Sequence, residues 1–101
     1  MDQTPEDRYG AVERAYGQGD FDAALAQALA LQPLIEPGRA DLLDQRLQLL
    51  IGHIQLYGMG RVDEAQIAYE AVLAACQEPS YRELAEQGRA LCAQTATAAA
   101  I

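Results

Sequence analysis

Apolar side chains recur along the chain at the three- and four-residue spacing that is typical of amphipathic helices. We expect a first helix from Thr4, whose side chain can cap free backbone amides, to Gly17. A second helix is expected from Asp20 to about Pro33, because proline lacks the N–H that continues a helix. The apolar stripes comprise Tyr9, Val12 and Tyr16 in the first helix and Phe21, Leu25, Ala28 and Leu29 in the second.

The middle of the chain predicts a loop and two further helices. Residues 33–38 include two prolines and a glycine, a composition that favours a turn. A long central helix is expected from Arg39 to Tyr57, and a fourth helix from Asp63 to Gln77. The inward positions are Leu42, Leu43, Leu47, Leu50, Ile51, Ile54 and Tyr57 in the third helix and Ala65, Ala68, Tyr69, Val72, Leu73 and Cys76 in the fourth.

A fifth helix is predicted at the C-terminal end of the chain. Ser80 and Glu83 fit the reciprocal Ser-x-x-Glu cap, which indicates a helix over residues 80–94. We expect its apolar face to carry Tyr81, Leu84, Gly88 and Leu91. Residues 95–101 have neither a cap nor an amphipathic pattern, so we expect this tail to fray.

Composition supports an all-α fold in one domain of residues 1–101. The chain contains 20 Ala and 13 Leu but only 11 Val, Ile and Thr together, a balance that favours helix over sheet. A chain of 101 residues is too short for two independent cores. It has no apolar run long enough to cross a membrane and no secretion signal, so we expect a cytoplasmic protein.

An internal repeat indicates how the helices are arranged. Residues 16–24 (YGQGDFDAA) align with residues 57–65 (YGMGRVDEA) at an offset of 41 residues, with five of nine positions identical. Each copy lies where one helix ends, a glycine turn follows, and a second helix begins. The repeated unit is therefore predicted to be a helical hairpin.

Each repeated residue type has a mechanical role in such a hairpin. Glycine adopts the left-handed conformation that ends a helix, which costs other residues about 1–2 kcal/mol. Phe21 and Val62 are expected to fill the space under the two turns. Ala24 and Ala65 leave room for the paired helices to approach closely. We therefore expect these small and apolar positions to be buried.

These residues resemble the tetratricopeptide repeat (TPR), a family of stacked helical hairpins. The matching positions are Gly19, Asp20, Phe21, Ala24 and Pro33 in the first unit and Gly60, Val62, Ala65, Tyr69 and Leu73 in the second. The period of 41 exceeds the usual 34 of the family, a difference that an inserted loop at residues 33–38 accounts for. The resemblance implies two stacked antiparallel hairpins, residues 4–33 and 39–78, and a capping helix at 80–94.

The net charge of the chain disfavours some kinds of binding partner. Fifteen Asp and Glu oppose seven Arg, and the chain has no Lys, giving a net charge of -8. Nucleic-acid binding is disfavoured, because that affinity rests on Lys and Arg neutralising phosphates. An anionic membrane surface is disfavoured for the same reason.

The candidate catalytic residues are better explained structurally. His53 is the only histidine, and its helical neighbours at spacings of three and four are apolar or Tyr57. Cys76 and Cys92 are expected to be buried free thiols, too far apart along antiparallel helices to form a disulfide. We therefore expect no enzyme activity, no metal site and no cofactor.

The most informative surface is apolar. In stacked hairpins the first helix of each pair lines a concave face, and these helices carry six candidate contact residues: Tyr9, Glu13, Tyr16, Leu50, Ile54 and Tyr57. Tyrosine suits interfaces because it buries a rigid ring and keeps a polar tip. The sequence thus predicts a non-catalytic interaction module that binds a peptide or helix of a partner protein in a groove. Two alternatives stay open: self-association into a dimer through the same face, and coverage of that face by the fifth helix.

Overall fold

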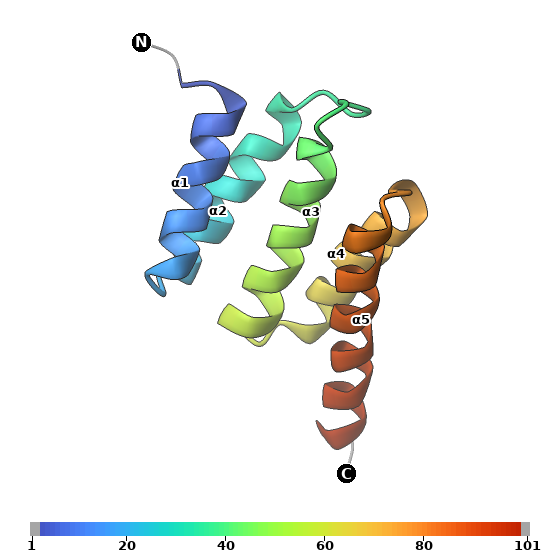
Figure 1. The fold of residues 1–101 in the computed structure, drawn as a ribbon. Coiled ribbons are helices and arrows are strands. Elements are labelled where there is room, and N and C mark those ends of the chain that lie inside the picture. Colours follow the sequence, from blue (N-terminus) through green and yellow to red (C-terminus); the bar gives the residue numbers. More distant parts are fainter. Residues whose placement is uncertain (1–2, 100–101) are drawn as a thin grey trace.

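The computed structural model describes residues 3–99 of the chain, with side chains through residue 96. It contains five α-helices and no strand over this range, as the sequence predicted. The α-helices are α1 (Pro5–Gly17), α2 (Phe21–Leu31), α3 (Leu43–His53), α4 (Val62–Ala75) and α5 (Pro79–Ala99) (Figure 1). A 3-10 turn, η1 (Gln32–Leu34), follows α2, and a π-helical segment, η2 (Ile54–Gly58), continues α3.

The helices pack in chain order. α1 pairs with α2 and α3 pairs with α4, which are the two predicted hairpins, and α5 lies against α4 and α3 (Figure 1). α3 is the central helix, since it contacts the other four. Its apolar residues therefore contribute to the packing on both sides of it.

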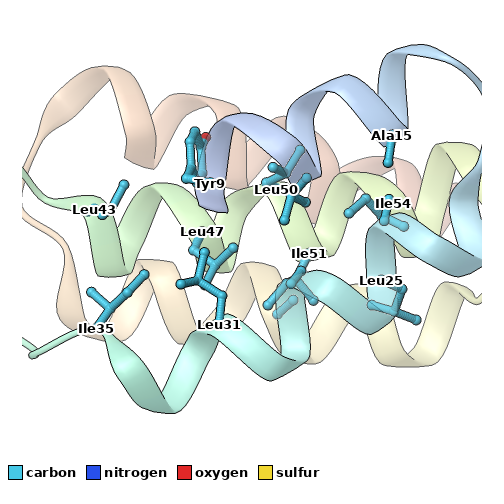
Figure 2. Close-up of a cluster of buried hydrophobic side chains, with 14 residues drawn as sticks. Tyr9, Ala15, Leu25, Leu31, Ile35, Leu43, Leu47, Leu50, Ile51 and Ile54 are labelled. Carbon is cyan, nitrogen blue, oxygen red and sulfur yellow. The ribbon is translucent and has the colours of Figure 1, made fainter. Parts of the chain in front are cut away.

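One hydrophobic cluster joins α1 and α2 to α3 (Figure 2). Val12 of α1, Leu31 of α2 and Leu47 of α3 meet in it, and all three are almost completely buried. Burying a leucine or valine stabilises a fold by about 1.5–3 kcal/mol. The contact between the first hairpin and α3 is thus part of the hydrophobic core of the protein.

A second cluster lies between α3, α4 and α5 and is centred on Tyr69. The Tyr69 ring is fully buried and is held between Gly52 of α3 and Gly88 of α5. A Cβ atom at position 52 would lie 2.9 Å from the ring, and one at position 88 would overlap it. These two glycines therefore make room for the aromatic ring.

The two hairpin turns share their glycine geometry. Gly19 and Gly60, which are equivalent in the repeat, both adopt positive φ, at 78° and 66°. Phe21 packs against Tyr16 of its own hairpin, with ring centroids 5.8 Å apart, and against Gly58 in the turn of the other hairpin. Ala24 and Ala65 are fully buried, as expected. Phe21 thus ties one turn to the other.

The central helix differs from its prediction at both ends. It begins at Leu43 rather than Arg39, and the Arg39 side chain forms ion pairs with Glu6 of α1 and with Asp41. The backbone of Leu42 is left-handed (φ 57°), and the Asp41 carboxylate accepts a hydrogen bond from the Leu43 N–H, at 3.2 Å. At the other end the last turn widens into the π-helical segment η2. The unusual backbone at Leu42 carries no signal in the sequence.

The ends of the remaining helices are partly as predicted. Thr4 caps α1, accepting a hydrogen bond from the Asp7 N–H while the Asp7 carboxylate accepts one from the Thr4 N–H. The predicted Ser80 cap is wrong: α5 begins at Pro79, and the Ser80 hydroxyl donates to Glu78 Oε1, at 2.9 Å.

The far end and the inward face of α5 also differ from expectation. The helix continues to Ala99, so the expected fraying from residue 95 is not seen, and residues 100–101 lie outside the described range. The side of α5 that packs inward comprises Ala85, Gly88 and Cys92. Leu84 and Leu91, which we expected inward, are exposed.

Candidate functional site

A groove of about 380 Å³ lies between α1, α3 and α5. α3 forms its floor, while α1 and α5 stand on either side without packing extensively against each other. The lining residues are Tyr9, Glu13 and Tyr16 of α1, Arg46, Leu49, Leu50 and His53 of α3, and Tyr81 and Leu84 of α5. Because each wall belongs to a helix anchored in a hydrophobic cluster, the groove is preformed.

Four of the six expected contact residues come together here: Tyr9, Glu13, Tyr16 and Leu50. Ile54 does not line the groove, because its side chain turns into the first hydrophobic cluster and is fully buried (Figure 2). Tyr57 is 55% exposed and lies beside His53, with ring centroids 5.5 Å apart, outside the groove lining. The widening of the helix at η2 shifts this last turn away from regular α-helical register.

Four further lining residues, Leu49, His53, Tyr81 and Leu84, were not among the expected contacts. Tyr81 and Leu84 come from α5, which the sequence left open as a cover for this face. α5 instead forms a wall, so the groove has three sides and an open mouth. The signal that could have placed Tyr81 and Leu84 at the groove is the apolar stripe of α5, on which the sequence already put both residues.

The groove combines an apolar lining with one charge of each sign. The Arg46 guanidinium lies over the Tyr9 ring, 5.0 Å from its centroid, a cation–π contact. Burial raises the pKa of Tyr9, and the neighbouring Glu13 carboxylate adds to this rise. Neither Arg46 nor Glu13 forms an ion pair with any other described residue. Both charges are therefore available to a ligand.

His53 connects the groove to the second hydrophobic cluster. Its Nδ1 lies 2.8 Å from the Tyr69 hydroxyl. Burial raises the pKa of Tyr69, so the phenol keeps its proton, and His53 is the one hydrogen-bond partner found for it among residues 3–96. We therefore assign Tyr69 as the donor and neutral His53 Nδ1 as the acceptor, which leaves the imidazole proton on Nε2. Burial also lowers the pKa of His53, consistent with a neutral ring.

This arrangement gives His53 a structural partner. The Tyr69 ring is clamped by glycines and its hydroxyl serves to orient the imidazole. Cys76 and Cys92 are both buried free thiols, as predicted. Within the described part of the chain, no cluster of three or more His, Cys, Asp or Glu side chains has the geometry to hold a metal ion.

Comparisons with protein-family models, curated protein sequences and solved structures found no match to the chain. Among the helices described, none combines the length and apolar character that crossing a bilayer requires.

Proposed function

We propose that the protein is a non-catalytic interaction module whose groove between α1, α3 and α5 docks a short segment of a partner protein. The observation that carries this proposal is the groove itself, an open-mouthed depression with predominantly apolar walls supplied by three helices. Its volume of about 380 Å³ lies near the lower end of the range for ligand sites. A groove of this size suits a few large side chains projecting from a helix or an extended strand.

The chemistry of the lining specifies the kind of segment. Tyr16, Tyr81 and Leu84 offer aromatic and aliphatic surface to apolar anchors of the partner. Arg46 and Glu13 lack ion-pair partners among the described side chains, so they favour a segment with an acidic and a basic residue beside those anchors. Exposed pairs of this kind add little affinity, about 0–1 kcal/mol each, but they fix orientation.

The resemblance to tetratricopeptide repeats supports the same proposal. The equivalent glycines at positions 19 and 60 share a left-handed conformation, and the small residues Ala24 and Ala65 are fully buried at equivalent places in α2 and α4. Stacked hairpins of this type present their first helices, here α1 and α3, on one face. The two buried free thiols agree with a reducing compartment such as the cytoplasm, where we expect the module to act.

Selection from a library of random displayed peptides tests this proposal, because it samples many segment sequences and requires no identified partner. The wild-type chain is expected to enrich peptides with paired apolar anchors. Tyr16→Ala and Leu84→Ala remove surface from opposite walls of the groove, and each should weaken the selected peptides about tenfold or more.

Leu29→Ala is the matched control, since Leu29 is 48% exposed but lies on α2, away from the groove. Peptide affinity should be unchanged in this variant, and circular dichroism should confirm that all three variants fold. Failure to enrich any peptide, or peptides that bind the Tyr16→Ala and Leu84→Ala variants as tightly as the wild type, would overturn the proposal.

A further inference from the structure

A stripe on the outer side of α5 borders the groove. Leu84 and Leu91 are seven residues apart, so they lie two turns apart on one side of the helix, and they are 42% and 38% exposed. Leu84 also lines the groove. The inward side of α5 is formed by other residues, so packing on α4 does not explain these two leucines. We call this feature the α5 ridge; at helical spacing it comprises Ser80, Leu84, Gln87, Leu91 and Gln94.

The α5 ridge carries no charged residue over about four helical turns. This is notable in a chain with 15 acidic residues and a net charge of -8, because two copies of such a chain repel each other. That repulsion opposes self-association least where the contact surface has few acids. The ridge is a helical surface that meets this condition.

The ridge and the groove are adjacent on one face of the molecule, since Leu84 belongs to both. A two-fold axis repeats the same patch on both partners, so a face with a protrusion beside a depression can fit a second copy of itself. We infer that the partner segment of the groove is α5 of a second copy, whose ridge enters the groove while its own groove receives the first ridge. This inference rests on the docking groove proposed above.

Charge complementarity supports this occupant. Glu83 lies beside the ridge and, like Arg46 in the groove, forms no ion pair with another described side chain. When the ridge of one copy sits in the groove of the other, its Glu83 carboxylate comes toward the Arg46 guanidinium of the other copy. The two-fold symmetry repeats this contact, so it occurs twice in the dimer. The same contact removes four half-exposed leucine side chains, two from each copy, from water.

Sedimentation equilibrium of the full chain, from micromolar to near-millimolar concentration, tests the inference. The wild type should form a reversible dimer. The double variant Leu84→Glu/Leu91→Glu should raise the dimer dissociation constant about 100-fold or more. The control Leu29→Glu changes a leucine of α2 that is at least as exposed, and it should leave the dissociation constant unchanged.

Charge reversal then tests the seating of the ridge in the groove. Arg46→Glu and Glu83→Arg should each weaken the dimer about fivefold, and combining them should restore the wild-type dissociation constant. A folded chain that stays monomeric throughout, a dimer that survives Leu84→Glu/Leu91→Glu, or a double reversal without rescue would overturn the inference. A monomer that still binds library-selected peptides through the groove would overturn this inference alone and leave the proposed function standing.

Discussion

The Tyr69 hydroxyl lies 2.8 Å from His53 Nδ1, and this hydrogen bond joins the floor of the groove to the most buried aromatic ring of the second hydrophobic cluster. Tyr69 cannot tilt away, because Gly52 and Gly88 hold its ring from opposite helices. His53 is thus fixed in one ring orientation and one tautomer. Groove geometry and fold stability are therefore coupled through a single contact.

The protonation of His53 predicts how stability depends on pH. Burial lowers the pKa of His53 in the folded chain below its unfolded value of about 6.5, so the unfolded state binds more protons in the interval between these two values. The contribution of His53 is therefore fully present above about pH 6.5 and is lost as pH falls toward the lowered folded pKa. Urea unfolding between pH 7.5 and pH 5 should show this decline.

The variant His53→Gln isolates that effect, because glutamine does not titrate. Its unfolding free energy should vary less over the same pH interval than that of the wild type. A backbone hydrogen bond and the contact with Arg39 lower the pKa of Glu6, and the hydrogen bond from Arg39 lowers the pKa of Asp41. Both carboxylates therefore act on stability only at more acidic pH. Identical pH profiles for the wild type and His53→Gln would contradict the assignment of a neutral, buried imidazole.

Gly52 and Gly88 pack directly against the Tyr69 ring. Because of this packing, the stability change expected for a Gly-to-Ala substitution is opposite in sign to the one that helix propensity predicts. Alanine normally stabilises a helix by about 1 kcal/mol relative to glycine. Gly88→Ala should nevertheless destabilise the chain by about 1–3 kcal/mol, because its Cβ would overlap the buried Tyr69 ring.

Gly17→Ala is the control for that substitution, since a Cβ at this helical position would meet nothing within 4 Å beyond its chain neighbours and the backbone of its own helix. This variant should be as stable as the wild type or more stable. Thermal and urea unfolding measure both changes. A Gly88→Ala variant that is more stable than the wild type would show that the ring is not held against α5.

Buried thiols predict low cysteine reactivity. Cys76 and Cys92 are almost completely inaccessible, and burial raises the pKa of Cys92, which disfavours its reactive thiolate. A thiol-specific chromogenic reagent should modify both cysteines slowly in the native chain and rapidly in denaturant. Rapid stoichiometric modification under native conditions would mean that the packing of α5 on α4 opens readily.

Much of the fold follows from local features of the sequence. The helix-breaking residues Gly17, Pro33 and Gly60 and the capping residue Thr4 act within one or two turns, so their effects can be read without knowing the tertiary structure. The repeat predicted both hairpins. The all-α fold with five helices is accordingly confirmed.

The parts that could not be predicted depend on contacts between distant residues. The helix α3 starts after the left-handed backbone of Leu42, which no residue nearby in the sequence indicates. Arg39, just before it, pairs with Glu6, more than thirty positions away. The inward side of α5 was only partly predicted: Gly88 was placed on it correctly, but its small buried members Ala85 and Cys92 were missed. Small residues give no hydrophobic signal, so Leu84 and Leu91 were assigned to the wrong side.

The same limit applies to the groove. Tyr9, Glu13 and Tyr16 share one side of a regular helix, so their common position along the groove followed from spacing. The positions of Ile54 and Tyr57 could not be predicted from spacing, because both residues lie in η2, where the regular α-helical spacing is interrupted. His53 has no partner nearby in the sequence, and its link to Tyr69 exists only through the packing of α3 on α4.

The groove is tested most directly by mapping where a library-selected peptide binds, using amide chemical shifts of isotope-labelled protein. We predict that the largest changes fall on α1, α3 and the first half of α5, at and next to Tyr16, His53 and Leu84. Changes concentrated on α2 and on the outer side of α4, with the groove residues unaffected, would contradict docking in the groove.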